Sequence, residues 1–411
     1  MSTSLAQQQV SQVGNFVDSE TQPSAVSRSK RPRLIQLDIL RGIAVFMVLC
    51  SHQIGTPSGP EYLRQFAWGL HNFGQTAVDL FFVLSGFLIG GLLISEIRET
   101  GDLNVKRFLV RRGFKIWPAY YVFLVVAFAH MMWHHGVNFH SGIDKLWPFV
   151  FNLQNYLGPF DLLTHTWSLA LEEHFYLLLP ILLWVMIRNR KKGIALRALP
   201  VVIIFALVVC TTWRFWNAMH RSQWQITDAS STHLRIDSIF FGVLISYFYQ
   251  TKPAWFLRLS KYPWTLLCLC CLLVAHRWFL ERVDVFVWTI GFTLCYIGYG
   301  CGLITFVHAQ PGRGWLGKLM DTGVAKMLAS VGLYSYSIYL WHFEFVGPFV
   351  MAKVVPLLPE SLKWPLGMMI YISGAILFGV LAAKLIELPM LSVRDRLFPR
   401  VSGMSPTSVR H

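Results

Sequence analysis

Long apolar runs follow one another along nearly the whole chain after residue 33. An apolar run of about 20 residues is long enough to cross the hydrocarbon core of a membrane as a helix. This criterion gives about ten runs, whose centres lie near Val45, Leu84, Val125, Leu178, Phe205, Gly242, Leu272, Leu294, Tyr339 and Ile376. The pattern predicts an all-α fold, a polytopic integral membrane helical bundle with about ten transmembrane helices and a membrane domain at 34–392.

Composition and charge support this class of protein. The chain is 54% hydrophobic and 14% charged, which leaves too little polar surface for a soluble globule. The net charge of +15 comes from membrane-flanking segments such as RNRKK at 188–192, and no nucleic-acid recognition module accompanies it.

Because short cytoplasmic loops contain the excess of lysine and arginine, we expect both termini in the cytoplasm. We expect a multi-pass protein of the bacterial inner (cytoplasmic) membrane whose partners include the lipid bilayer and no nucleic acid. Residues 1–33 are predicted to be a disordered cytoplasmic tail, and residues 393–411 a basic cytoplasmic tail.

An arginine and a histidine interrupt the first apolar run, LDILRGIAVFMVLCSH. Arg41 and His52 are eleven positions apart, and almost nothing polar lies between them. A charged side chain near the centre of a spanning helix costs about 2.5 to 3.5 kcal/mol, so such residues mark functional sites with partners. Taken alone, Arg41 is also compatible with snorkelling to the headgroups, and His52 with an interfacial histidine.

Other polar residues fall at a similar depth in the outer half of the predicted bundle. Adjacent glutamates point about 100° apart on a helix, and Arg235 and Asp237 are compatible with a local pair, although i,i+2 residues do not face each other. Because several helices each bury charge at one level, a shared polar cavity is the favoured interpretation. Its candidate residues are Asp79, Trp167, Glu172, Glu173, Arg235 and Asp237.

A basic cluster, VKRFLVRRGFKIWPAYY, begins the third run. Lys106 and Arg107 are interpreted as ordinary positive-inside charge. Arg111 and Lys115 share a helix face at i,i+4, and with Arg112 they lie close to Pro118. Together with Arg41, these three residues predict a pocket for phosphate or carboxylate groups.

No metal site is predicted. The seven cysteines all fall inside apolar runs, and CLCC at 268–271 has no histidines or open loop. His134, His135 and His140 have no adjacent carboxylate to complete a site.

These segments together resemble the acyltransferase 3 family of integral membrane acyltransferases. The resemblance extends from about Leu34 to Pro389, in the expected order. It rests on LDILRGIAVFMVLCSH, FFVLSGFLIGG, RRGFKIWPAYY, TWSLALEEHFYLLLP, LRIDSIFFG, YSYSIYLWH and LIELP. It implies about ten spans with both termini inside. It also implies transfer of an acetyl or other short acyl group from cytoplasmic acyl-coenzyme A, with acetyl-coenzyme A as donor substrate, to a hydroxyl of a glycan or lipid-linked sugar.

The resemblance also implies roles for individual residues. His52 becomes the candidate catalytic base, and Glu173 or Glu172 the active-site carboxylate. Asp79 is grouped with the catalytic carboxylates. Lys115 stands where arginine is common in the family, and His174 where glutamine is usual. The remaining assignments are Arg41, Arg111, Arg112 and Lys115 for donor binding, and Trp167, Arg235, Asp237 and His342 for substrate binding.

Two alternatives stay open at this point. Transfer is either direct, which we prefer, or passes through an acyl-histidine. The other function class is a polytopic transporter or a glycan-exporting membrane protein without acyl transfer. A secondary transporter commonly has inverted repeats with broken helices, and the two halves of this chain show no internal similarity. The acceptor is expected among cell-surface or secreted glycans, such as exopolysaccharide or lipopolysaccharide.

Overall fold

The computed structural model describes residues 34–52, 55, 57–135, 139–157, 163–189, 192–220, 226–281 and 284–398. These residues form helices and connecting turns and contain no β-strand. The predicted tail at 1–33 lies outside the described residues, as do residues 399–411 of the predicted basic tail. Residues 393–397 continue the last helix. The all-α fold is confirmed.

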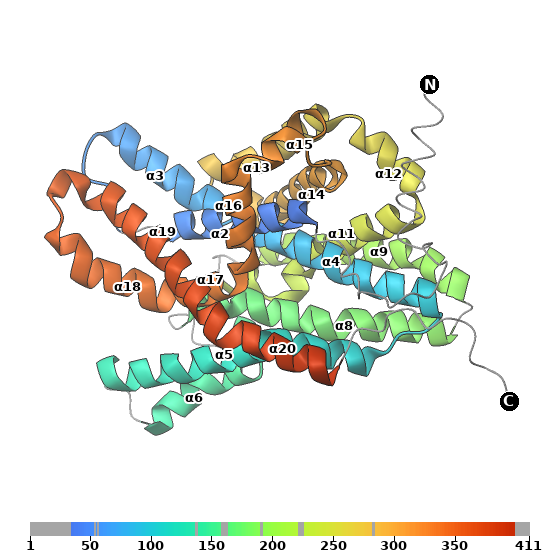
Figure 1. The fold of residues 1–411 in the computed structure, drawn as a ribbon, viewed down its shortest axis with the longest axis horizontal. Helices are drawn as coiled ribbons and strands as arrows, with labels where there is room; N and C mark the ends of the chain where they lie inside the picture. Colours follow the sequence, from blue (N-terminus) through green and yellow to red (C-terminus); the bar gives the residue numbers. More distant parts are fainter. Residues whose placement is uncertain are drawn as a thin grey trace, which may run out of the picture.

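The helices follow the apolar runs in order (Figure 1). All ten predicted centres lie within helices. The helices and short helical turns are α2 (Ile35–Ser51), α3 (Glu61–Gly74), α4 (Ala77–Thr100), α5 (Val105–His135), α6 (Phe139–Val150), α7 (Gln154–Leu157), η1 (Thr164–Thr166), α8 (Trp167–Asn189), α9 (Lys192–His220), α10 (Ile226–Ser230), α11 (Thr232–Thr251), α12 (Pro253–Ser260), α13 (Pro263–Phe279), η2 (Val287–Gly291), α14 (Phe292–His308), α15 (Gly314–Met320), α16 (Gly323–Leu333), α17 (Ser335–Trp341), η3 (His342–Val346), α18 (Gly347–Phe349), η4 (Val350–Val354), η5 (Val355–Leu357), η6 (Glu360–Leu362), α19 (Lys363–Ala382), η7 (Ala383–Glu387) and α20 (Leu388–Leu397).

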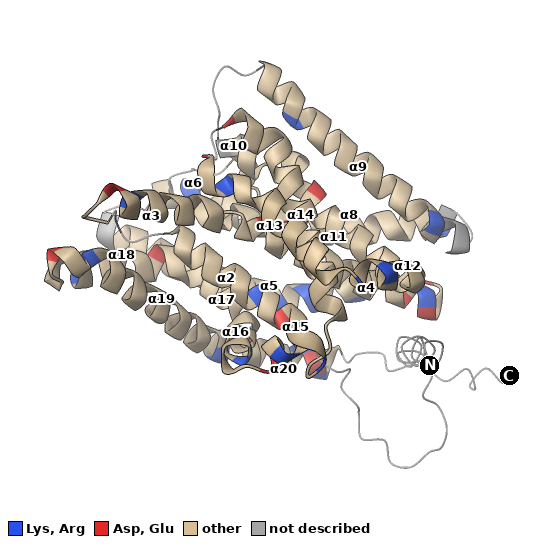
Figure 2. Cartoon of the chain, turned by 90° about the horizontal axis from the view of Figure 1, so that it is seen from above, with Lys and Arg blue, Asp and Glu red and all other residues tan. Residues whose placement is uncertain are grey.

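Length and hydropathy identify a polytopic membrane bundle. Among the described residues, seven helices are long and apolar enough to cross a membrane, or up to eight if α12 and α13, which meet at 80°, form one span. The polytopic helical bundle is therefore confirmed, whereas the count of ten and the cytoplasmic termini stay predictions. Figure 2 shows α9 and α19 with few charged positions. Val201 and Phe205 of α9 are 69% and 70% exposed, as expected for side chains that face lipid.

Two pairs of glycines let helices pack with their backbones in contact. A Cβ atom on Gly86 of α4 would lie 1.9 Å from the Ile239 carbonyl oxygen of α11, and one on Gly242 would lie 2.2 Å from the Val83 oxygen. Gly332 of α16 and Gly42 of α2 form the second pair and bring these two helices together in the same way. Small residues at helix interfaces permit this close approach inside membranes. The glycines therefore fix α4 against α11 and α2 against α16.

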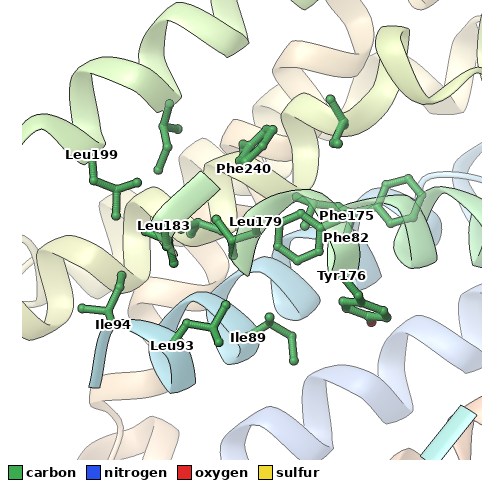
Figure 3. Close-up of a cluster of buried hydrophobic side chains, with 14 of the residues drawn as sticks. Phe82, Ile89, Leu93, Ile94, Phe175, Tyr176, Leu179, Leu183, Leu199 and Phe240 are labelled. Atoms are coloured by element: carbon green, nitrogen blue, oxygen red, sulfur yellow. The ribbon is translucent and has the colours of Figure 1, made fainter. Parts of the chain in front are cut away.

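The largest buried cluster fills the space between α4, α8, α9 and α11. In Figure 3, Leu179 and Leu183 of α8 lie between Ile94 and Leu93 of α4 and Leu199 of α9. Inside a membrane, close van der Waals packing of such side chains stabilises the contacts between helices. This packing fixes α8, and hence its paired glutamates, against α4.

Candidate active site

Arg41 and His52 lie toward opposite ends of α2. Arg41 is in the second turn, and His52 is the residue at which the helix ends. Eleven residues at 1.5 Å each separate the two positions by about 16 Å along the axis. Because α2 is a continuous helix packed against α3, α4 and α16, this separation is a fixed property of the fold.

Arg41 lines a cavity between α2, α4, α5, α8 and α17. Arg112 and Lys115 enter this cavity from α5, where a spacing of i,i+3 puts both on one face. Glu172 of α8 also lines it, and the apolar part of the wall includes Phe82 of α4. Three cationic groups and one carboxylate give the lining a net positive charge. The cavity is therefore suited to an anionic group.

Glu172 and Arg112 are held by a shared hydrogen-bond network. Glu172 accepts from Ser85 Oγ at 2.9 Å and from Tyr176 OH at 2.6 Å. Arg112 donates to the same Tyr176 hydroxyl, and its guanidinium lies 4.2 Å from the centre of the tyrosine ring. The network orients the guanidinium from α5 and the carboxylate from α8 within one wall.

Arg111 does not line this cavity, although it precedes Arg112 directly. Its guanidinium lies 3.3 Å from the Asp395 carboxylate of α20 and also donates to the Phe398 carbonyl. The predicted set of donor-binding residues is thus divided: Arg41, Arg112 and Lys115 come together, while Arg111 holds the last helix against α5.

The paired glutamates also point to different neighbours. Glu173 accepts from the Trp117 indole N–H at 3.1 Å, whereas Glu172 lines the cavity. This divergence is the one expected for adjacent residues on a helix.

His52 meets two further histidines at its end of α2. The His342 Nε2 atom lies 3.2 Å from His52 Nδ1. The ring of His165 lies 5.5 Å from that of His342, centre to centre, and its Nε2 donates to the Leu340 carbonyl at 3.0 Å. His342 and His165 are buried. We call His52, His165 and His342 the histidine cluster.

The sequence interpretation did not include His165. It comes two residues before Trp167, directly before the segment TWSLALEEHFYLLLP, and this neighbourhood was the available signal. Its closeness to His342 depends on the packing of η1 against α17, which spacing along the chain does not encode.

Tyr339 touches both the basic cavity and the histidine cluster. Its side chain lines the cavity, as does Ser168, whose hydroxyl lies 2.7 Å from the tyrosine hydroxyl. The Tyr339 hydroxyl donates to the His165 carbonyl at 2.6 Å, and the Tyr339 carbonyl accepts from His342 Nδ1 at 2.7 Å. The two parts of the candidate site are therefore adjacent.

The other predicted charges form a second cluster of buried ion pairs. Arg235 lies 2.6 Å from Asp79, which joins α11 to α4. Asp237 lies 2.7 Å from Arg214, a residue of α9 that the sequence interpretation did not single out. Trp167 packs beside this cluster, with its ring centre 5.7 Å from the Arg235 guanidinium carbon. Asp79, Arg235 and Asp237 thus cross-link helices.

The sequence of the chain matches a family model and several curated relatives. The family model described as "Acyltransferase domain" matches residues 34–384. The chain is 28% identical over 348 residues to "Peptidoglycan O-acetyltransferase OatA" of Listeria monocytogenes, covering 78% of this chain and 50% of that protein. It is 27% identical over 384 residues to "Putative peptidoglycan O-acetyltransferase YrhL" of Bacillus subtilis, covering 89% of this chain and 56% of that protein.

The chain spans about half the length of the curated relatives it matches. No solved structure matches it. Since the family match includes every helix from α2 to α19, the protein belongs to the acyltransferase 3 family.

Proposed function

We propose that the protein is a membrane O-acetyltransferase. It moves an acetyl or other short acyl group from cytoplasmic acyl-coenzyme A to a hydroxyl of a cell-surface or secreted glycan. The observation that supports this proposal best is that one helix, α2, presents Arg41 to the basic cavity and His52 to the histidine cluster. The relatives named as peptidoglycan O-acetyltransferases support the reaction class.

In this proposal, the basic cavity holds the phosphorylated head of the donor. Arg41, Arg112 and Lys115 supply the positive charge, and guanidinium groups form strong charge-assisted hydrogen bonds with phosphate oxygens. Acetyl-coenzyme A has a long flexible arm between its head and its thioester. That arm is comparable in length to the separation of about 16 Å between Arg41 and His52. The thioester is thereby brought to the histidine cluster.

His52 acts as the general base of a direct transfer. Its ring takes the proton of the acceptor hydroxyl while the hydroxyl oxygen attacks the thioester carbonyl carbon. The carbon–sulfur bond then breaks, and the coenzyme A thiolate leaves with the proton that His52 received. Such a base contributes about 10²- to 10⁴-fold to a rate. Glu172 keeps Arg112 oriented through Tyr176, and a catalytic role of Glu173 stays a prediction.

The test measures acetyl-coenzyme A consumption by membrane vesicles that contain the full chain and the host's surface glycan. We expect release of free coenzyme A together with acetylated glycan detected by mass spectrometry, and loss of both in His52→Ala. His220→Ala is the matched control, because His220 is exposed at the end of α9 and stacks on Trp216. An exporter or transporter without acyl transfer would leave acetyl-coenzyme A intact, and equal acetylation by His52→Ala would exclude His52 as the base.

A further inference from the structure

The contacts of His342 determine which of its ring nitrogens holds the proton. Its Nδ1 lies 2.7 Å from the Tyr339 carbonyl oxygen. A carbonyl only accepts hydrogen bonds, so Nδ1 of the neutral ring is the protonated nitrogen. The other nitrogen, Nε2, then has a free lone pair, and it lies 3.2 Å from Nδ1 of His52. His342 therefore offers His52 an acceptor.

Two further acceptors surround the same nitrogen of His52. The Val48 carbonyl oxygen lies 3.1 Å from His52 Nδ1, and the Ser51 hydroxyl oxygen lies 3.3 Å from it. Ser51 directs its own proton to Val48 at 2.7 Å, so its oxygen is available as an acceptor. With these three acceptors from the described residues around it, His52 Nδ1 holds the ring proton. The lone pair is then on Nε2, where a base needs it.

Of these three acceptors, His342 is the one that comes from another part of the fold. Val48 and Ser51 belong to the same helix end as His52, whereas His342 follows it by 290 residues. The His342 side chain is fully buried and begins the π-helical turn η3. Such turns occur frequently at functional sites. The ring is therefore held rigidly from α17 and η3.

We propose that His342 is the positioning residue of His52, and this rests on the proposed acyl transfer. His342 holds the His52 ring as its Nδ1–H tautomer, with Nε2 directed to the acceptor hydroxyl. When Nε2 takes the hydroxyl proton, His342 Nε2 stabilises the resulting imidazolium through the same hydrogen bond. The proton then leaves on the coenzyme A thiol, and His342 is never protonated. This is the task of the aspartate in a Ser-His-Asp triad, performed here by a neutral imidazole. It differs from the substrate-binding role predicted for His342 from the sequence.

The kinetic test compares two replacements of His342 in vesicles containing the full chain, with acetyl-coenzyme A and the host's surface glycan. We expect His342→Leu to lower kcat by about 10²-fold with the KM for acetyl-coenzyme A unchanged. In His342→Gln the amide oxygen comes near the place of Nε2 and accepts from His52, so kcat returns to within about tenfold of wild type. Equal kcat for wild type and His342→Leu, or equal loss in both variants, would overturn the proposal.

His276 provides the matched control. Its Nδ1 bonds the Leu273 carbonyl at 2.8 Å, three residues back, just as His342 bonds Tyr339. Its Nε2, however, is buried and has no hydrogen-bond partner among the residues that the structure describes. His276→Leu therefore removes the same backbone bond without touching His52, and we expect kcat to stay unchanged. A loss of kcat in His276→Leu equal to that in His342→Leu would assign the effect to folding and contradict the proposal.

A second measurement is independent of turnover. The ¹⁵N spectrum of histidine-labelled full-length protein in phospholipid vesicles reports the tautomer of His52, identified by difference from His52→Gln. We expect a protonated Nδ1 in wild type and His342→Gln, and a mixture of tautomers in His342→Leu. A wild-type ring protonated on Nε2, or an unchanged spectrum in His342→Leu, would refute the positioning role. Because this readout needs no acetyl-coenzyme A, the absence of acyl transfer would contradict the proposed function alone.

Discussion

Arg214 and Asp237 form an ion pair in which both side chains are fully buried, with Nη2 of the arginine 2.7 Å from Oδ2 of the aspartate. The guanidinium also donates to the Thr289 carbonyl at 3.0 Å. Removing one partner leaves an uncompensated buried charge, which costs about 3 to 5 kcal/mol. We expect Arg214→Met to lower the thermal midpoint of the detergent-purified protein strongly.

The double variant Arg214→Met/Asp237→Leu distinguishes stability from acceptor binding. Because it removes both charges, we expect it to recover most of the lost thermal stability. Acetylation per folded molecule should then match wild type. A stable double variant with a raised KM for the glycan would instead support the substrate-binding role predicted for Asp237.

Asp79 gives a related prediction. It accepts from Arg235 at 2.6 Å and from the Ser238 hydroxyl at 3.1 Å, and both contacts join α4 to α11. We expect Asp79→Asn to lower stability, because the buried Arg235 loses its counter-charge. Its kcat per folded molecule should stay within about tenfold of wild type, since general acid–base residues contribute 10²-fold or more. A stable but inactive Asp79→Asn protein would instead support the catalytic role predicted for Asp79 from the sequence.

The basic cavity predicts different effects for two adjacent arginines. Arg112 lines the cavity, whereas Arg111 contacts Asp395 of α20. A charge-assisted hydrogen bond contributes about 1.5 to 3 kcal/mol. We therefore expect Arg112→Gln to raise the KM for acetyl-coenzyme A by about 10- to 100-fold. Arg111→Gln is the control and should leave that KM unchanged. A raised KM in Arg111→Gln with an unchanged KM in Arg112→Gln would instead place the donor on the α20 side of α5.

Gly86 tests the backbone contact between α4 and α11. An added Cβ would lie 1.9 Å from the Ile239 carbonyl oxygen, so the helices must separate to admit a methyl group. We expect Gly86→Ala to reduce the yield of monodisperse protein on size-exclusion chromatography. Gly323→Ala is its control, because a Cβ there meets no atom within 4 Å. Equal yields of the two variants would show that α4 can shift.

Much of the fold could be predicted because membrane helices follow from local composition. Apolar runs such as those centred on Val45 and Leu84 lie where helices α2 and α4 form. The divergence of Glu172 and Glu173 followed from helix geometry alone. In such cases, neighbouring residues in the chain contain the whole signal.

The unpredicted part of the site depends on contacts between distant segments. Which of Arg111 and Arg112 faces the cavity depends on where α20 packs, and the Asp395 partner of Arg111 is 284 residues away. Arg214 lies in an apolar run, and its partner Asp237 is adjacent only because α9 packs beside α11. His165 lies in a three-residue turn, and a single sequence contains no periodic signal for such a turn.

The continuity of α2 has a consequence for donor selection. In the proposed reaction, the helix sets a fixed distance between the two ends of the donor: Arg41 binds the head, and the thioester must lie at His52. A donor is therefore selected first by the length of its arm, whatever its acyl group. Donors with the same head and arm but different short acyl chains should be admitted alike, and the choice among them would be made at the His52 end of the helix.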